Sequence, residues 1–390
     1  MLEQKKSFIP FHLPDIGEEE INSVVETLRS GWLTTGLKTK QFESEFADFI
    51  GVSQAVALNS CTAALHLALE AVGVTAGDEV IVPTMTFAAT AEVVHYCRAS
   101  PVLVDCTSDT LNVDVDAIEQ AITSKTKAII PVHFAGQPCE MDRILELARS
   151  RNIKVIEDAA HALPAKYEGE MVGALGDIAC FSFYATKTMT TGEGGMATTE
   201  NGEWAERMRI LSLHGISRDA VNRYTPEGSW YYEICYPGYK YNLTDMASAL
   251  GIAQLRKCHK FREIRHRYAK FYNEAFKEIP ELTIPHVNEG IEHAWHLYVI
   301  QLNLEKLRIG RDQIIDLLKE RGIGTSVHFI PLHLHPYYRN NNMYSSSKNF
   351  SVANQVFTRI ISLPIYPKMT DVDVQYVIEN VTGLVQQYRR

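Results

Sequence analysis

Hydrophobic and polar residues alternate along the first 50 residues in a pattern that predicts two amphipathic helices. In residues 15–30 four apolar side chains recur at helical spacing, and Gly31 follows as a residue that commonly ends a helix. These four are Ile21, Val24, Val25 and Leu28. A loop rich in hydroxyl groups and glycine, residues 32–36, leads to the second helix, which carries Phe42, Phe46 and Phe49.

Short apolar runs alternate with helical patterns between residues 55 and 199. The seven runs are 55–58, 79–83, 101–105, 128–133, 154–158, 177–183 and 195–199. This alternation predicts an α/β fold with a mostly parallel seven-stranded sheet covered by helices on both faces. Ligands of such sheets bind beyond the carboxyl ends of the strands, so the residues after each strand are the candidates for chemistry.

Beyond residue 213 the pattern changes twice. Residues 214–240, which include Trp230, are irregular and aromatic, and a stretch of that length is typical of a functional or interface segment. A long helix is then predicted from about Asp245, and after it a strand at 296–302, a helix at 311–321, a strand at 324–330 and a closing helix after Asp371. We therefore divide the chain into a large domain, 1–250, whose first 30 residues are an N-terminal segment, and a small C-terminal α+β domain, 251–390.

The composition excludes several classes of protein. A hydrophobic content of 46% and a charged content of 22% are typical of a globular protein in water. The net charge of -9 opposes a nucleic-acid partner or an anionic membrane surface. The seven cysteines are odd in number and lack metal-ligand spacing, which predicts a reduced, cytoplasmic protein without a metal site. No apolar run predicts a membrane span or an export signal.

Lys187 is the first candidate for chemistry. It follows the apolar run 177–183, where a buried strand meets the edge of the sheet. Burial there would lower the pKa of the ammonium group and favour the nucleophilic amine. Taken alone, a solvated loop lysine is the commoner explanation, since lysine is seldom buried.

Other strand ends carry complementary groups, each of which also has an ordinary structural explanation. Asp158 ends the run 154–158 and is either a partner for a heteroaromatic nitrogen or a helix cap. Cys61 and Thr62 open a helix whose free amides suit a phosphate, although the pattern also describes any well-capped helix. Phe87 is either a core residue or a ring contact, and His161 and His133 are more often satisfied polar residues than catalysts.

Together these groups match the needs of pyridoxal 5'-phosphate. That cofactor requires a lysine for the Schiff base, an acid at the pyridine nitrogen, donors for the phosphate and an aromatic contact for the ring. Lys187 and Asp158 are the predicted catalytic residues. Cys61 and Thr62 with Ser182, and Phe87, supply the remaining contacts.

The chain resembles the sugar aminotransferases of the DegT/DnrJ/EryC1/StrS family over essentially its full length. The resemblance rests on SGWLTTG at 30–36, NSCTAALH at 59–66, EDAAHA at 157–162, TTGEGG at 190–195 and PGYKYN at 237–242. Within the family the chain is most similar to the aminotransferases of spore-coat polysaccharide and of 4-amino-4-deoxy-L-arabinose synthesis, which share AWHLY at 294–298 and GTSVH at 324–328. Leu37 departs from the family, which usually has proline after the TTG.

The resemblance implies the PLP-dependent transferase fold type I, similar to aspartate aminotransferase, and a homodimer with shared active sites. It implies that Cys61 and Thr62 bind phosphate mainly through backbone amides, that Ser182 adds a hydroxyl group, and that His161 lies near the ring. It also implies that Asn242 reaches the cofactor phosphate of the neighbouring subunit. Substrate contacts are expected from Thr35, Tyr184, His328, His333 and Tyr337.

The implied reaction moves an amino group from L-glutamate, which leaves as 2-oxoglutarate, to C4 of a UDP- or dTDP-linked 4-keto-6-deoxy sugar used in bacterial surface or secreted polysaccharide. Pyridoxamine 5'-phosphate would be the alternate form of the cofactor. Amination at C3 would use the same residues. A sugar dehydratase is a weaker alternative, because the relatives with that activity have histidine in place of Lys187. A non-enzymatic regulator that binds the cofactor is another, and no DNA-binding module supports it.

Overall fold

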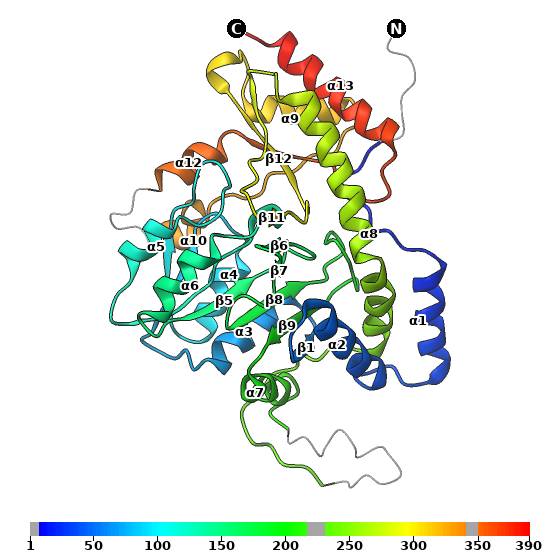
Figure 1. The fold of residues 1–390 in the computed structure, drawn as a ribbon, viewed down its shortest axis with the longest axis vertical. Coiled ribbons are helices and arrows are strands. Elements are labelled where there is room, and N and C mark those ends of the chain that lie inside the picture. The colour runs from blue at the N-terminus through cyan, green and yellow to red at the C-terminus, as the bar shows by residue number, and fades with distance from the viewer. Residues whose placement is uncertain (1–7, 217–230, 341–349) are drawn as a thin grey trace.

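A seven-stranded sheet forms the centre of the larger lobe in this computed structural model, which describes residues 8–216, 231–340 and 350–390. Its strands lie in the order β1 (Gln54–Leu58), β9 (Gly195–Thr199), β8 (Ile178–Ser182), β5 (Lys154–Asp158), β4 (Thr126–Ile129), β2 (Glu79–Pro83) and β3 (Ser100–Val104) (Figure 1). Only β9 runs antiparallel to its neighbours, so the prediction of a mostly parallel sheet is confirmed. Trp230 and most of the irregular stretch before it lie outside the described residues.

Helices cover both faces of this sheet because successive strand residues point in opposite directions. Val56 and Leu58 of β1 belong to the core under α3 (Cys61–Ala71), α4 (Ala89–Tyr96) and α7 (Gly202–Ser212). Ala55 and Ala57 face the other side, where the core includes α2 (Leu37–Ile50) and the first turns of α8 (Asp245–Phe276). The helices α5 (Val115–Ala121) and α6 (Met141–Arg149) continue this second layer.

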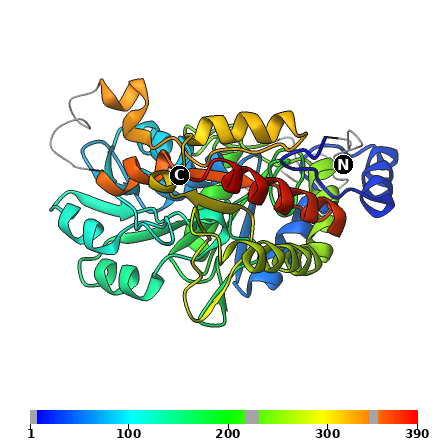
Figure 2. The ribbon, with the colours of Figure 1, turned by 90° about the horizontal axis from the view of Figure 1, so that it is seen from above.

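The smaller lobe packs around a three-stranded sheet in the order β10 (Leu282–Thr283), β12 (Tyr298–Leu302) and β13 (Ile360–Leu363). The helix α8 connects the lobes, and α9 (Arg311–Glu320) and α13 (Asp371–Gln387) lie side by side on the smaller one (Figures 1 and 2). Shorter elements complete the fold: α10 (Pro336–Arg339), α12 (Ser351–Phe357), and a small sheet of β11 (Ile291–Glu292), β6 (Lys166–Tyr167) and β7 (Glu170–Met171). None of the helices in the described ranges is both long and apolar enough to cross a membrane.

Two predicted strands differ from the structure. The regular strand β4 ends at Ile129, and the rest of the run 128–133 stays beside β5 through a bridge between Val132 and Asp158. The chain then turns into a 3-10 helix at Phe134–Gly136. The run 324–330 forms only a single bridge, from Ser326 to Ser362. Its apolar residues, Val327 and Phe329, instead pack against the core of the larger lobe, so their pattern reflects packing and not a sheet.

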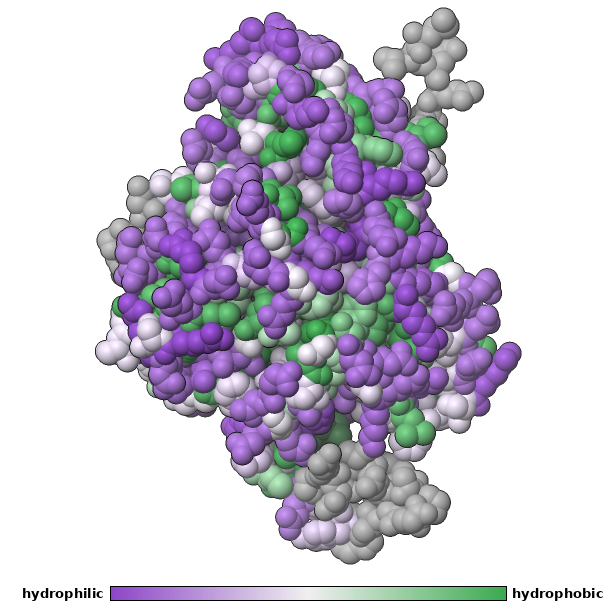
Figure 3. Space-filling view, viewed as in Figure 1, coloured by the Kyte–Doolittle hydropathy of each residue, from purple (hydrophilic) through white to green (hydrophobic). Residues whose placement is uncertain are grey.

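The first predicted helix exists, but its apolar side is not the buried one. The helix α1 (Glu18–Ser30) ends at Gly31, whose left-handed backbone lets its N–H bond to the Leu28 carbonyl. It buries Glu20 and Thr27 against α8, whereas Ile21 and Leu28 are 47% and 50% exposed. Hydrophobic side chains also gather near the middle of the face shown in Figure 3. The protomer therefore leaves apolar surface uncovered.

The segment before α1 packs against the smaller lobe. The backbone of Ile9 is hydrogen-bonded on both sides, to Gly322 and to Gly324, at 2.8 Å each. Its side chain is part of the smaller lobe's core. This segment then passes the junction between the lobes on its way to α1.

Candidate active site

Lys187 faces a cavity of about 350 Å³ at the carboxyl ends of β5 and β8. A tight turn follows β8, in which the Lys187 N–H bonds to the Tyr184 carbonyl at 2.9 Å. The half-buried side chain then points into the cavity. Burial lowers the pKa of Lys187 to about 8, and the charge of Asp158 opposes this shift. The nucleophilic amine is therefore a far larger fraction of the group near neutral pH than in an ordinary lysine, although the ammonium form still predominates at pH 7.

Asp158 lies at the end of β5 and lines the same cavity. One carboxyl oxygen accepts a hydrogen bond from the Thr90 hydroxyl at 2.8 Å, and the other accepts from the Ala160 N–H at 3.2 Å. Burial raises the pKa of Asp158 although these two donors and Lys187 lower it. A buried carboxyl group of this kind is stabilised by a hydrogen-bonded partner with which it can share a proton.

The N-terminus of α3 forms another wall of the cavity. Ser60 caps this helix by accepting a hydrogen bond from the Ala63 N–H at 3.0 Å, while the amides of Cys61 and Thr62 have no carbonyl partner within the helix. The Cys61 thiol points away, toward the Cys180 carbonyl at 3.5 Å. The backbone amides, and not the thiol, are therefore the groups that an anion would meet.

Gly195 is what lets β9 approach this helix end. A Cβ atom at that position would lie 2.5 Å from the Cys61 nitrogen and in collision with the Ser60 carbonyl carbon. The Ser182 side chain lines the cavity from the neighbouring strand. Any larger residue in place of Gly195 would displace the helix end.

Aromatic rings enclose the rest of the cavity. His161 lies parallel to Phe329 with ring centroids 5.7 Å apart, and its Nδ1 accepts a hydrogen bond from the Ala135 N–H at 3.3 Å. Burial lowers the pKa of His161 well below its ordinary value, so the ring is neutral. Phe87 also lines the cavity but is 64% exposed.

Two predicted substrate contacts are part of this cavity. The His328 ring bonds to the Ser362 hydroxyl at 2.8 Å and stacks with Phe11 of the N-terminal segment at 5.4 Å. Burial lowers the pKa of His328 to about 4. Tyr184 also lines this cavity and is exposed.

Four predicted site residues lie elsewhere in the protomer. Thr35 and Asn242 line a separate cavity of about 480 Å³, where the Asn242 amide donates to the Thr35 hydroxyl at 2.7 Å. His333 bonds to the Thr84 hydroxyl at 2.7 Å, and Tyr337 is exposed beside His95. None of these four lines the Lys187 cavity of the same protomer.

His133 is a satisfied polar residue, as its ordinary explanation predicts. Its Nε2 bonds to the Glu157 carboxylate at 2.9 Å, and its Nδ1 accepts from the Cys139 N–H at 3.1 Å. The other Glu157 oxygen accepts from the Gly176 N–H at 2.8 Å. This buried pair lies on the opposite face of β5 from Asp158, because successive strand residues alternate.

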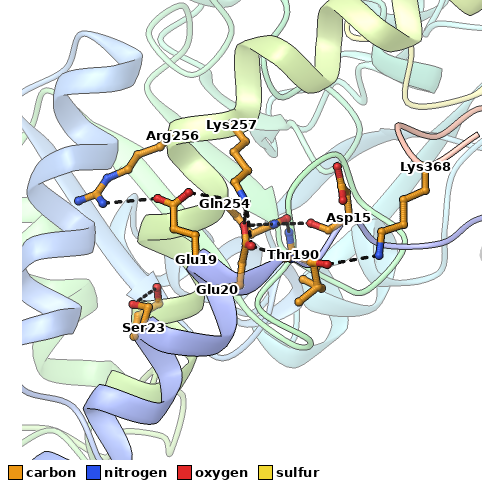
Figure 4. A network of polar contacts seen from close by, with 12 residues as sticks. Asp15, Glu19, Glu20, Ser23, Thr190, Gln254, Arg256, Lys257 and Lys368 are labelled. Atoms are coloured by element: carbon orange, nitrogen blue, oxygen red, sulfur yellow. Dashed lines mark hydrogen bonds and ion pairs between the residues drawn. The ribbon is translucent and has the colours of Figure 1, made fainter.

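A buried network supports the turn that carries Lys187 (Figure 4). The Thr190 N–H donates to Oε1 of Gln254 on α8 at 3.3 Å. The Gln254 amide donates in turn to the Asp15 carbonyl at 2.8 Å and to Glu20 at 2.9 Å, and Lys257 pairs with Glu20 at 2.7 Å. Residues of α1 and α8 thus support the Lys187 turn through this network.

The sequence interpretation missed Thr90, His296, Phe329 and Gln254. Thr90 had a local signal, because Thr86 and Thr90 are four residues apart at the start of a helix and their hydroxyl groups bond at 2.8 Å. His296 lies within the AWHLY motif at 294–298, and that motif alone did not indicate a cavity residue. Phe329 and Gln254 come from segments far away in the chain and had no local signal.

Comparison with known proteins shows what the chain is similar to. The model of the DegT/DnrJ/EryC1/StrS aminotransferase family matches residues 14–382. The chain is 54% identical to the uncharacterized protein MJ1066 of Methanocaldococcus jannaschii over 385 residues, which are 99% of this chain and 100% of that protein. It is 49% identical to the spore coat polysaccharide biosynthesis protein SpsC of Bacillus subtilis over 387 residues, 99% of each.

Solved structures agree with these relatives. Spr1654 from Streptococcus pneumoniae in its PLP form has a TM-score of 0.90 and 38% identity, over 97% of this chain and 99% of that one. PseC of Helicobacter pylori, an aminotransferase involved in the biosynthesis of pseudoaminic acid, has a TM-score of 0.91 and 28% identity, over 98% of this chain and 100% of that one.

Proposed function

Because the chain belongs to the DegT/DnrJ/EryC1/StrS aminotransferase family and is a PLP-dependent sugar aminotransferase, we propose that it moves the amino group of L-glutamate to C4 of a UDP- or dTDP-linked 4-keto-6-deoxy sugar. The product would serve surface or secreted polysaccharide, a role supported by the 49% identity to SpsC. The observation that carries the proposal is that Lys187, Asp158 and the α3 N-terminus line one cavity.

The side chains around this cavity fit pyridoxal phosphate. The Lys187 amine would bind the aldehyde carbon, and the buried Asp158 carboxyl group would face the pyridine nitrogen. The amides of Cys61 and Thr62, with the Ser182 hydroxyl, would hold the phosphate. Phe87 and His161 would pack against the ring. When bound, the cofactor supplies the carbonyl that accepts the amine and a ring that accepts electrons.

The chain's own groups would manage the protons. The free Lys187 Nζ would act as the general base that takes a proton from the substrate carbon, and the same ammonium group would then donate that proton as the general acid. A pKa of about 8 suits this role, because the group both accepts and releases a proton near neutral pH. Asp158 would favour a protonated ring nitrogen, since a buried carboxylate is stabilised by a positive partner.

We further propose that two copies form a dimer with shared active sites. Thr35 and Asn242 lie in a second cavity, away from their own Lys187, and in such a dimer they would contact the cofactor of the neighbouring subunit. The apolar side chains of Trp32, Leu33 and Leu37 are exposed near Thr35, and a second copy would cover such a surface.

We also propose that the protein is cytoplasmic and that the boundary between the two domains lies at residue 250. All seven cysteines are free, which suits a reducing compartment. The boundary falls within α8, whose first turns pack in the larger lobe while Tyr272 and Phe276 belong to the smaller lobe's core.

Absorbance spectroscopy tests the reaction. The purified protein with pyridoxal phosphate should absorb near the edge of the visible range, and L-glutamate should bleach this band. Lys187→Ala should abolish the bleaching, while Lys154→Ala, a surface lysine paired with Asp177, should not. Assays with 4-keto and 3-keto nucleotide sugars then identify the aminated carbon. A wild-type protein that gains no such band would refute the proposal.

Mixing two inactive variants tests the shared sites. In the proposed dimer each active site takes Lys187 from one subunit and Asn242 from the other. Lys187→Ala and Asn242→Ala therefore each remove the contribution of a different subunit. After subunits exchange, half of the dimers are mixed and each has one intact site, so about a quarter of the wild-type activity should return. No recovery, with exchange verified by a mass tag, would show that each subunit is complete in itself.

A further inference from the structure

Arg265 is a fully buried cation without a carboxylate partner. It lies on α8 with 0% of its surface exposed. Its Nη1 donates to three carbonyl oxygens, those of Trp295 at 3.3 Å, His296 at 3.2 Å and Ile365 at 2.6 Å. No aspartate or glutamate in residues 8–216, 231–340 and 350–390 forms an ion pair with it.

The free edge of this guanidinium group is the one suited to an anion. Nε and Nη2 are buried and have no hydrogen-bond partner in the described chain. Their two N–H bonds are parallel, and this edge is the one that binds carboxylates and other oxyanions in a bidentate manner. Nε and Nη2 of Arg265 are therefore two aligned donors for which the described chain provides no acceptor.

Two histidines at the same junction also have unpartnered ring nitrogens, His12 Nε2 and His296 Nδ1. Arg265 holds the His296 carbonyl, and His12 lies 5.7 Å from the ring of Tyr366, next to the Ile365 carbonyl that Arg265 also holds. The lowered pKa values of both histidines have burial as the first cause and include the positive charge of Arg265. Four buried nitrogen atoms, two of Arg265 and one from each of two histidines near enough to feel its charge, thus lack partners in the described chain.

Burial of a charge without a counter-charge costs several kcal/mol, and buried charges in proteins are almost always paired. Arg265 does not escape this cost by losing its proton, because burial lowers its pKa only to about 10. Cys258 offers no negative charge in compensation, because burial raises the pKa of its thiol group well above its ordinary value. No acidic side chain in the described part of the chain supplies the compensating charge, and a bound anion would supply it.

We propose that Arg265, with His12 and His296, binds one small monovalent anion, a halide or a carboxylate of formate size, as a permanent part of the folded protein. His296 lines the Lys187 cavity and Arg265 does not, so the anion lies behind that cavity, apart from the substrate. This site is independent of the proposed sugar reaction. An ordered water molecule would satisfy the donors but not the charge, and it is the outcome against which the proposal is tested.

Anomalous diffraction tests the site directly. Crystals of the PLP-loaded protein grown with sodium bromide should show an anomalous peak within hydrogen-bond distance of Arg265 Nε and Nη2. Adding excess sodium formate distinguishes the two anion classes, since loss of the peak indicates a carboxylate site and its persistence a halide site. A water molecule at full occupancy, with no bromide peak and no formate density, would overturn the proposal.

Thermal unfolding tests the same site in solution. Replacing chloride by gluconate, which is too large to enter, should lower the Tm of the wild type by about 2 °C at constant ionic strength. Arg265→Met should not respond to the exchange. Arg262→Met is the matched control, because Arg262 lies one turn away, is partly exposed and pairs with Glu292 at 3.0 Å, and it should respond like the wild type. An identical Tm in both salts for the wild type would contradict the proposal, and the diffraction experiment stands even if Arg265→Met fails to fold.

Discussion

The Thr190 N–H and Gln254 Oε1 join the turn after Lys187 to the helix between the two lobes, at a distance of 3.3 Å. Both residues are buried, and Gln254 is itself held by Asp15 and Glu20. The Lys187 turn is therefore positioned by α8 and by the segment that leads into α1 (Figure 4). Its geometry depends on contacts that lie outside the Lys187 cavity.

Gln254→Leu should destabilise the protein and loosen the Lys187 turn. The substitution removes the partners of the Thr190 N–H and of the Asp15 carbonyl, while Glu20 keeps Lys257. A buried polar group without a partner costs about 1–3 kcal/mol. We expect a lower Tm and weaker retention of pyridoxal phosphate during dialysis. Gln41→Leu removes an exposed side-chain contact to Glu45 and should change neither quantity. Equal effects of the two variants would argue against the bracing role.

Gly195→Ala should weaken cofactor binding through the α3 N-terminus. The added Cβ would collide with the backbone of Ser60 and Cys61, which cannot move as a flexible side chain can. Overpacking of this kind costs roughly 1–3 kcal/mol, and the displaced amides should bind phosphate less tightly. Titration of the apo-protein with pyridoxal phosphate measures the loss. Gly202→Ala is the control, because nothing lies within 4 Å of a Cβ at that position.

Thr90→Val should slow amino transfer without preventing folding. The change keeps the shape of the side chain but removes the hydroxyl group that donates to Asp158 at 2.8 Å. Because that donor stabilises the carboxylate, its loss should raise the pKa of Asp158 further and weaken its hold on a protonated ring nitrogen. We expect kcat to fall about tenfold. Thr358→Val, which removes an exposed hydroxyl group, should leave kcat unchanged.

The rate at which the apo-protein takes up pyridoxal phosphate should depend on the pKa of Lys187. The amine attacks the aldehyde and the ammonium does not, so the rate should rise with pH up to about 8 and then level off. A lysine with the ordinary pKa of 10.5 would give a rate that continues to rise beyond pH 9. Stopped-flow absorbance measures the profile, with N-acetyl-lysine in solution as the reference. A profile that follows the reference would show that burial does not lower the pKa of Lys187.

Much of the site could be predicted from strand ends alone. Lys187 and Asp158 follow strands that lie next to each other in a parallel sheet, and the carboxyl ends of such strands meet at one edge. The start of α3 could also be predicted from the sequence, because a capping serine before a helical pattern is a local signal. Strand 324–330 was predicted wrongly, because an apolar run that packs against another lobe has the same local pattern as a strand.

The sequence by itself determined the order of strands and helices, the strand ends that carry Lys187 and Asp158, and the family, because these depend on local periodicity and on short motifs. Only the tertiary structure decided that Thr90 supports Asp158, that Gln254 holds the lysine turn, and that α1 buries Glu20 in place of its apolar residues. The tertiary structure also decided that Arg265 is buried without a carboxylate partner. Its shortest hydrogen bond is to the carbonyl of Ile365, which is 100 residues away in the sequence. Contacts between distant segments arise from how the layers pack, and no repeating pattern of hydrophobic residues along the chain encodes them.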